Sequence, residues 1–325
     1  MRTLFRAFLL ALFAVTAQPF GIAAAQSYPS KPIRLIVPFP PGGPADTLAR
    51  LVSDKLSASL KAQVIVENRA GAGGNIGMEL GAKAPPDGHT LVLAPAGNLT
   101  VNPSLYRNVP YDVARDFVPV TALAAVPNIL VVHPSVPVKS VGELIAYAKA
   151  RPGQLNFSSP GPGSGAHLAG ELFKSSAGLD MVHVPFNGIA PAVTAVLGGQ
   201  VQLMFAGASS ALPHVKGNKL TALGVASLQR MAAAPELPTI AESGLPGFDV
   251  TSWYGIVAPA GTPMEIVNLL QSSIASGLAQ PDAREKLAGL GAEPMGNTPA
   301  EFATMIRSEA AKWGKIVKDA NIRIE

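Results

Sequence analysis

The sequence of 325 residues contains no cysteine, has only 14% charged residues and has few aromatic residues, with two tryptophans. Without cysteine the chain has neither a disulfide nor a thiol that could carry a lipid anchor. A nucleic-acid binder needs clustered Lys and Arg, and the chain has no basic run to supply them. We therefore expect a protein that is stabilised by packing alone and has no nucleic-acid partner.

The first 25 residues have the layout of a secretory signal peptide. Arg2 and Arg6 precede the apolar stretch 7–17, and residues 23–25 offer an A-x-A cleavage site before Gln26. The alternative, a single membrane anchor, is disfavoured because this apolar stretch is too short to span a bilayer. We expect cleavage after Ala25 and export, with the formal net charge falling from +4 to +2.

Apolar residues make up 48% of the chain, and 32 Gly and 30 Pro are scattered between periodic segments. This content suffices for about two domains with many short connections. Short apolar runs alternate with segments of helical spacing, which predicts parallel sheets with helices on both faces. We expect strands at residues 33–37, 64–66, 90–93, 129–132, 155–157, 181–184, 201–205 and 220–225.

Three predicted helices begin with a capping box, in which a hydroxyl caps the helix and a Glu three residues later reaches back. Pro263 and Pro299 are expected at the first helical position of two of them. The three pairs are Ser140 with Glu143, Thr262 with Glu265, and Thr298 with Glu301.

Two glycine-rich loops, residues 39–47 (FPPGGPADT) and 158–167 (SSPGPGSGAH), each join a predicted strand to a predicted helix. Glycine lets the backbone approach a ligand closely, and a helix start offers unpaired N–H groups with the positive end of the dipole. Neither loop contains Lys or Arg. Two uncharged anion cradles predict a carboxylate-bearing small molecule that is held from both sides.

Enzyme motifs are weak or missing in the sequence. Residues 161–166 match the dinucleotide fingerprint G-x-G-x-x-A, but Asn187 stands where the acidic ribose contact belongs, and Asp180 precedes that strand. No P-loop, G-x-S-x-G elbow or H-E-x-x-H motif occurs. His167 and Glu171 share a helix face without further clustered ligands. We expect no enzyme, no cofactor and no metal site.

Ordered motifs run through the whole mature chain: YPSKPI at 28–33, VPFPPGG at 37–43, VENRAGAGG at 66–74, PDGHT at 86–90, YDV at 111–113, FVPV at 117–120, VPFNG at 184–188, and WYG at 253–255 followed by AP at 258–259. In these motifs the chain resembles the Bordetella uptake gene (Bug) family, the periplasmic receptors of tripartite tricarboxylate transporters.

The resemblance implies an α/β fold of the type II periplasmic binding protein kind. This fold is a two-lobed Venus flytrap with mixed, mostly parallel sheets and helices on both faces. The first lobe would comprise residues 26–125 plus 250–325, and the second lobe residues 126–249. One glycine loop then falls in each lobe, while Trp253 and Tyr254 are interpreted as hinge or core aromatics.

The resemblance further implies that backbone amides and ordered water hold the carboxylate between the lobes. Some expected contacts have a structural alternative: Asp46 and Ser164 could cap helices, His167 could bond a neighbouring carbonyl, and Asn98 could close a turn. The expected ligand contacts are Phe39, Gly42, Gly43, Asp46, Thr47, Ala96, Gly97, Asn98, Ser158, Ser159, Gly163, Ser164, Gly165, His167, Asn187, Gly188 and Ala208.

The function implied is that of a monomeric periplasmic receptor that performs no chemistry. It would capture a di- or tricarboxylate, an amino acid or an aromatic acid and present it to the membrane subunits of a tripartite tricarboxylate transporter. The alternative is a sensor of the same fold that signals to a membrane partner. Which carboxylate is bound stays open at this point.

Overall fold

The computed structural model describes residues 28–319. The predicted signal peptide and the cleavage position after Ala25 lie outside the described residues. The chain divides into residues 1–30 and residues 31–325, and the elements described below all belong to the second part.

One group of elements surrounds three parallel strands near the start of the chain. The first strand, β1, has parallel neighbours on both sides, β2 and β3, because its apolar residues are buried on both faces. The strands are β1 (Ile33–Val37), β2 (Val64–Asn68) and β3 (Thr90–Pro95). The helices and short turns of this group are α2 (Pro44–Leu60), η1 (Ala72–Gly74), α3 (Asn75–Ala82), η2 (Gly97–Val101), α4 (Asn102–Leu105), α5 (Val113–Asp116), α10 (Met264–Leu278), α11 (Pro281–Gly289) and α12 (Pro299–Asp319).

A second group surrounds another set of parallel strands. The strand β5 lies between β6 and β7 and runs parallel to both. The strands are β5 (Leu155–Ser159), β6 (Met181–Pro185), β7 (Leu203–Gly207) and β8 (Thr221–Val225). The helices are α6 (Val141–Lys149), α7 (Gly165–Ala177), α8 (Ile189–Leu197) and α9 (Ala208–Lys216).

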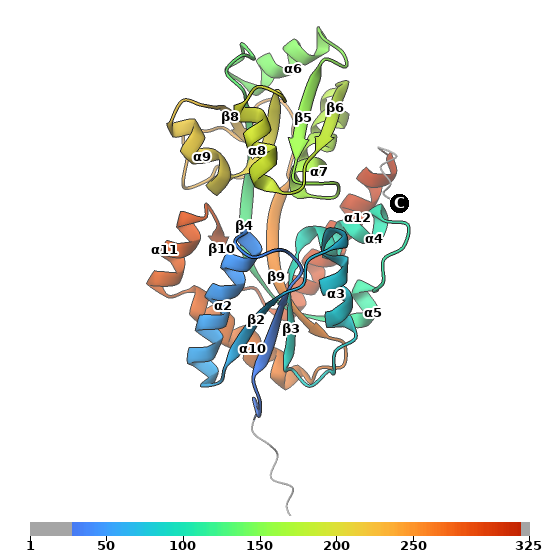
Figure 1. Cartoon of the computed structure of the whole chain (residues 1–325), viewed down its shortest axis with the longest axis vertical. Helices are drawn as coiled ribbons and strands as arrows, with labels where there is room; N and C mark the ends of the chain where they lie inside the picture. The colour runs from blue at the N-terminus through green and yellow to red at the C-terminus, as the bar shows by residue number, and fades with distance from the viewer. Residues whose placement is uncertain (1–27, 320–325) are drawn as a thin grey trace, which may run out of the picture. The chain divides into compact units, whose positions relative to one another are not determined.

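Two long strands, β4 (Phe117–Val132) and β9 (Thr251–Pro259), connect the groups. They pair antiparallel from Phe117 opposite Pro259 to Pro127 opposite Thr251. The last residues of β4 then pair with β7 and β8. In Figure 1 the green β4 and the orange β9 run side by side between the two groups. The strands form the path β2-β1-β3-β9-β4-β7-β5-β6, and the predicted two-lobed α/β fold is confirmed.

The expectation of mostly parallel pairing is wrong. Among the described strands four pairs are parallel and five are antiparallel. The physical reason is that β4 leaves the first group and β9 returns to it, so the two strands run in opposite directions. The short strand β10 (Glu293–Pro294) adds a further antiparallel pair to β4.

Two of the three predicted capping boxes occur. The hydroxyl of Thr298 accepts from the Glu301 amide, and Glu301 accepts from the Thr298 amide at 2.8 Å. Ser140 caps α6 in the same way, although Glu143 reaches the amide of Lys139.

The third predicted box, Thr262 with Glu265, is wrong. Pro263 is the N-cap of α10 with ψ 134°, outside the helix, and the Thr262 hydroxyl instead donates to the Pro259 carbonyl at 2.7 Å. The preceding turn therefore satisfies the hydroxyl that was expected to cap the helix.

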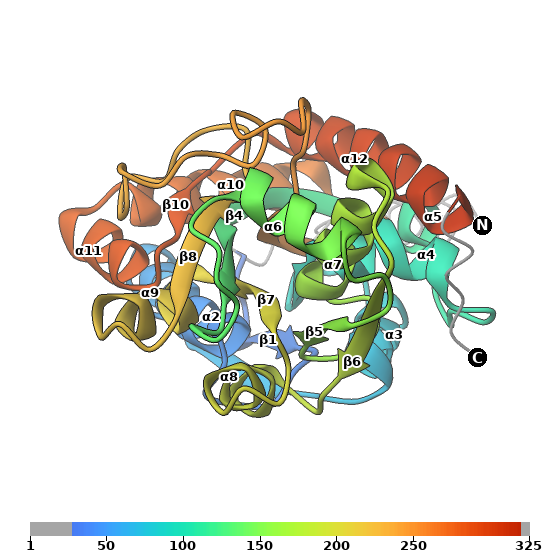
Figure 2. The ribbon, with the colours of Figure 1, turned by 90° about the horizontal axis from the view of Figure 1, so that it is seen from above.

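Buried apolar residues form separate clusters in the two groups. The first group's cluster contains Trp253 and Phe302, whose rings meet edge to face at 5.5 Å, so Trp253 is a core aromatic. The second group's cluster also takes in Leu105, Trp313 and Val317 from α4 and α12. Figure 1 and Figure 2 both show the red helix α12 beside α4. The helix α12 thus packs against both groups.

Across residues 28–319 each helix is too short or too polar to serve as a membrane span.

Candidate functional site

The first glycine loop leads from β1 into α2. Gly43 is the N-cap of α2 in an extended conformation, and no side chain caps the helix. Pro44 follows at the first position, where its missing N–H costs nothing. A β-carbon on Gly42 or Gly43 would meet no atom within 4 Å. The amides of Ala45 and Asp46 therefore have no intrahelical acceptor, and the two glycines before Pro44 border open space.

Asp46 holds this loop in place. Its carboxylate is 4% exposed and accepts from the Gly42 amide at 3.0 Å, from Asn68 Nδ2 at 3.1 Å and from the Arg50 guanidinium at 3.0 and 3.1 Å. Burial alone would raise the pKa of Asp46, but the bonds from Arg50, Gly42 and Asn68 outweigh it and lower the pKa below 3.8. Asp46 is thus ionised and neutralised by Arg50, so the loop stays without net charge.

Phe39 and Thr47 flank the same turn. The Phe39 carbonyl accepts from Asn68 Nδ2 at 3.0 Å, and the exposed Thr47 donates from its hydroxyl to the Gly43 carbonyl at 3.2 Å. Asn68, at the end of β2, therefore ties both ends of the loop together. The sequence reasoning missed this residue, although it lies in the VENRAGAGG motif.

Three of the expected ligand contacts, Ala96, Gly97 and Asn98, follow β3 directly. We call these three residues the first-lobe wall. Asn98 is 2% exposed, donates from Nδ2 to the Gly73 carbonyl at 2.9 Å, and accepts through its own carbonyl from Tyr111 at 2.8 Å. The side chain of Asn98 thus links η2 to η1 and does not close its own turn, which was the structural alternative predicted for it. Two further buried polar residues of this network, which were not predicted, are Asn75 and Asn102.

The second glycine loop leads from β5 into α7. Ser158 and Ser159 are fully buried, and the Ser158 hydroxyl donates to the Ala192 carbonyl at 3.1 Å. The Ser159 hydroxyl lies 2.7 Å from His183 Nε2 and accepts from the Gly161 amide at 3.2 Å. Both hydroxyls therefore act inside the second lobe.

Ser164 and His167 fix the start of α7. Ser164 is the N-cap, accepting from the His167 amide at 3.3 Å and donating to the Gly161 carbonyl at 2.7 Å. His167 is 5% exposed, and its Nδ1 accepts from the Gly163 amide at 3.1 Å. The alternative in which His167 bonds a neighbouring carbonyl is wrong for Nδ1, which accepts from an N–H instead. The amides of Gly165 and Ala166 remain in the first turn without an intrahelical acceptor.

Three other predicted residues lie at helix starts of the second lobe. Asn187 is exposed and precedes Gly188, whose amide donates to the Pro160 carbonyl at 3.1 Å, so both adjoin the second loop. Gly188 is the N-cap of α8 and has no side-chain cap. Ala208 is buried at the start of α9, which also has no side-chain cap.

The first-lobe wall reaches the second loop directly. A β-carbon on Gly97 would lie 3.3 Å from the Gly163 carbonyl oxygen, closer than an ordinary van der Waals contact, and one on Gly163 would crowd Leu105. A β-carbon on Gly165 would overlap the hydroxyl of Ser252 in β9. The structure thus brings the wall and the second loop together, while ligand contact by each predicted residue remains a prediction.

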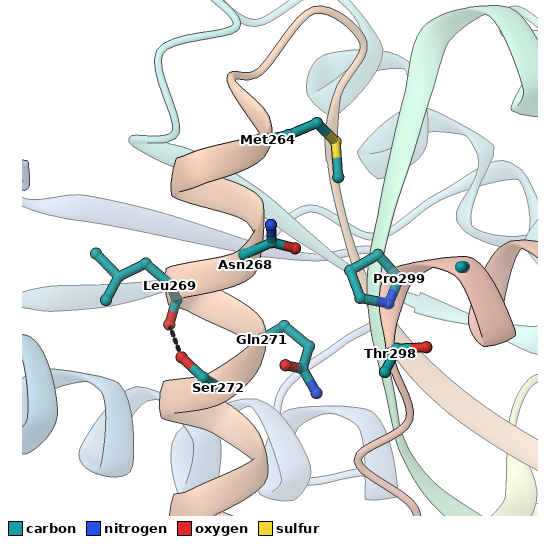
Figure 3. A pocket seen from close by; sticks show the side chains of 8 residues that line it. Met264, Asn268, Leu269, Gln271, Ser272, Thr298 and Pro299 are labelled. Atoms are coloured by element: carbon teal, nitrogen blue, oxygen red, sulfur yellow. Dashed lines mark hydrogen bonds between the residues drawn. The ribbon is translucent and has the colours of Figure 1, made fainter.

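Surface grooves lie elsewhere. One groove of about 640 Å³ is bounded by α10 and the start of α12, with Met264, Asn268 and Leu269 on one side and Thr298 and Pro299 on the other (Figure 3). A second groove of about 380 Å³ lies among α2, α10 and α11 around Lys55 and Asp282. Neither is lined by a predicted ligand contact.

Groups that could hold a metal were also sought. Within residues 28–319 no cluster of three or more His, Cys, Asp or Glu side chains has a metal-binding arrangement. His167 faces the Gly163 amide and Glu171 pairs with Lys174 at 3.0 Å, so the two residues do not act together.

The chain is similar in sequence to a known family and to a protein of that family. A family model described as "Tripartite tricarboxylate transporter family receptor" matches residues 48–322. Protein BugT of Bordetella pertussis is 39% identical over 321 residues, which cover 98% of this chain and 98% of BugT.

Solved structures are similar over nearly the whole chain. The structure of R. palustris Rpa4515 with adipate is 38% identical with a TM-score of 0.84, covering 91% of this chain and 99% of that one. MatC (Rpa3494) from Rhodopseudomonas palustris with bound malate is 34% identical with a TM-score of 0.79, covering 89% of this chain and 100% of that one.

Proposed function

The chain belongs to the tripartite tricarboxylate transporter receptor family, and we propose that it captures a small carboxylate in the periplasm and presents it to the membrane subunits of such a transporter. The observation that carries the proposal is the set of helix starts around the predicted cleft. The start of α2 in one lobe and the starts of α8 and α9 in the other have no side-chain cap. Uncapped amides at a helix start favour an anion.

We propose a carboxylate as the anion, in preference to a phosphate. The guanidinium of Arg50 is occupied by Asp46, and Lys174 is occupied by Glu171, so we propose that backbone amides and not these two cations hold the acidic group of the ligand. Adipate and malate, the acids bound by the two similar structures, are the first candidates. Tricarboxylates, amino acids and aromatic acids are the other classes to compare.

The binding mechanism follows from the amides. Each buried hydrogen bond to a carboxylate contributes about 1.5–3 kcal/mol, so a few amides suffice to orient the acid. We propose that hinge rotation then brings the second lobe's amides onto the bound solute. The lobes would comprise residues 26–125 plus 250–325 and residues 126–249.

We also propose that residues 1–25 are a signal peptide cleaved after Ala25, and that the mature chain acts as a monomer. A receptor that presents solute to different membrane complexes must diffuse freely, which a cleaved leader permits. Intact-mass measurement of the secreted protein determines the cleavage position. Size-exclusion chromatography with light scattering determines the oligomeric state.

The test is a thermal-shift screen of residues 26–325 against mono-, di- and tricarboxylates, amino acids and aromatic acids, followed by calorimetry. A true ligand raises the melting temperature by mass action. Gly43→Asp places a negative charge at the open start of α2 and should abolish binding. Gly142→Asp is the matched control, since Gly142 also lies in a helix start with no atom near its added β-carbon.

Two outcomes would contradict the proposal. One is the absence of a thermal shift with every acid tested, and the other is unchanged affinity in Gly43→Asp. Loss of uptake of the labelled acid on deletion of the protein would separate delivery from signalling by a sensor.

A further inference from the structure

Three stacked rings lie beneath the second glycine loop. Phe157 comes from β5, His167 from α7 and His183 from β6. The two imidazoles stack at 4.0 Å with their planes 18° apart, and Phe157 stacks on His183 at 4.9 Å. Because each ring is anchored in a different element, the stack fixes the planes of both imidazoles and therefore the directions of their nitrogens.

One imidazole holds the middle of the loop. His167 Nδ1 accepts from the Gly163 amide at 3.1 Å, so Nδ1 carries no proton and the neutral ring is protonated at Nε2. This bond turns the Gly163 amide inward, where Gly163 has a φ of +76° that glycine adopts without strain. The amides that remain for a solute are those of Gly165 and Ala166.

The other imidazole holds the beginning of the loop. His183 Nε2 lies 2.7 Å from the Ser159 hydroxyl, which accepts from the Gly161 amide at 3.2 Å. The Gly161 carbonyl in turn accepts from the Ser164 hydroxyl at 2.7 Å, and Ser164 caps α7. A continuous chain of hydrogen bonds thus runs from His183 to the helix start.

Both imidazoles are neutral at ordinary pH. Burial, with the neighbouring His183 and then Lys174 adding smaller effects, lowers the pKa of His167 to about 3. Burial and then Lys174 lower the pKa of His183 to about 4. The charged groups facing the stack are Lys174, whose Nζ lies 5.9 Å from the Phe157 ring centre, and its partner Glu171. A neutral His167 can accept a hydrogen bond, whereas a protonated one cannot.

We propose that His167 and His183 are positioning residues of the solute site, which hold loop 160–164 so that the first-turn amides of α7 are directed at the bound carboxylate. The inference rests on the proposed function for the identity of the site. In this role neither ring needs to touch the solute. His167 acts through the Gly163 amide, and His183 acts through the Ser159 hydroxyl.

The test uses paired variants that keep or remove one acceptor. His167→Asn places an amide oxygen near the position of Nδ1, whereas His167→Leu retains bulk without an acceptor. His183→Gln keeps a polar partner for the Ser159 hydroxyl near the position of Nε2, whereas His183→Leu removes it. Hydrogen exchange of the segment 158–168 in the ligand-free protein and calorimetry with adipate are measured for all four and for the wild type.

In the two Leu variants we expect the hydrogen exchange of the loop amides to become about tenfold faster and the affinity for adipate to fall about tenfold. In His167→Asn and His183→Gln we expect exchange rates and affinity to return most of the way to the wild-type values. Nitrogen-15 NMR of the wild type should show His167 unprotonated at Nδ1, which checks the geometry even if a Leu variant fails to fold. A protonated Nδ1, or equal effects of Leu and Asn at position 167, would overturn the inference.

Failure of the proposed function gives a different result. If the wild type binds no carboxylate while the exchange pattern follows the acceptor, the positioning of the loop stands and the assignment of its ligand is wrong. If the wild type binds adipate and the Leu variants bind it equally well with unchanged exchange, the positioning role is wrong and the receptor function stands.

Discussion

A β-carbon on Gly97 would lie 3.3 Å from the carbonyl oxygen of Gly163, although Gly97 follows β3 in the first lobe and Gly163 precedes α7 in the second. The lobes therefore meet here backbone to backbone. Any side chain at position 97 must push the second loop away. A side chain larger than that of glycine at this point would therefore oppose a closer approach of the two lobes.

The first prediction concerns this contact. Gly97→Val should weaken adipate binding roughly tenfold, because overpacking a close contact typically costs about 1–3 kcal/mol. The melting temperature without ligand should change little, since the lobes can separate. Calorimetry checks the affinity, with Gly142→Val as control at a glycine whose added β-carbon meets nothing within 4 Å. Wild-type affinity in Gly97→Val would show that the contact is not needed for closure.

The second prediction compares two helix glycines. A β-carbon on Gly170 in α7 would overlap the buried Phe157 ring, whereas one on Gly142 in α6 has open space. Gly170→Ala should lower the free energy of unfolding by about 1–3 kcal/mol through overpacking. Gly142→Ala should raise it by up to about 1 kcal/mol through helix propensity. Urea unfolding measures both, and equal effects would contradict the packing described for Phe157.

The third prediction concerns Asp46 and pH. Asp46→Asn should lower the free energy of unfolding at pH 7 by about 1–3 kcal/mol, the usual contribution of hydrogen bonds to a charged group. The pKa of Asp46 is lowered in the folded state, so its contribution is complete above the unfolded value of 3.8 and is lost as the pH falls through the folded value. The difference in free energy of unfolding between Asp46→Asn and wild type should thus stay constant from pH 8 to pH 5 and shrink below pH 4.

Chemical unfolding at several pH values measures this difference. Glu236→Gln, at an exposed carboxylate, is the matched control. If the difference in free energy of unfolding between Asp46→Asn and wild type is as large at pH 3 as at pH 7, the Asp46 carboxylate is not the source of the lost stability.

The fourth prediction concerns the buried imidazoles. Unfolded His takes up protons with a pKa near 6.5, whereas the folded pKa is about 3 for His167 and about 4 for His183. The unfolded state therefore binds more protons below pH 6.5, and stability falls on acidification by up to about 1.4 kcal/mol per pH unit for each ring. His167→Asn should flatten the dependence between pH 6.5 and pH 5, while His214→Asn, outside the stack, should not. A wild-type stability that is constant across this range would contradict the burial of the pair.

Much of the fold follows from the sequence, because the strands within each lobe are short apolar runs followed by glycine turns and helices. The long strands β4 and β9 were harder to predict. Pro119 and Pro127 lie inside β4, and proline normally argues against a central strand. The strand tolerates Pro119 because its register shifts between Pro119 and Thr121, so that regular pairing is interrupted there, and Pro127 is the last residue of β4 that pairs with β9.

The site was predictable in its backbone and less so in its side chains. Glycine loops at helix starts can be recognised from composition, and both lie where the sequence predicts them. The sequence cannot show that Asn68 and His183 bind these loops, because each lies more than 20 residues from its partner. His183 did carry one signal: it alternates with Met181 along β6, which places it on the inner face of that strand.

The pairing of Pro127 with Thr251 has a consequence for how such receptors can vary. The segment between these residues leaves the first lobe and returns to it at neighbouring positions on two adjacent strands. This segment can therefore be replaced by the corresponding segment of a relative, with both junctions at the paired residues Pro127 and Thr251. A chimaera made this way keeps the first lobe's loop and takes the second lobe's loop from another receptor, so each lobe's share of solute choice becomes separately measurable.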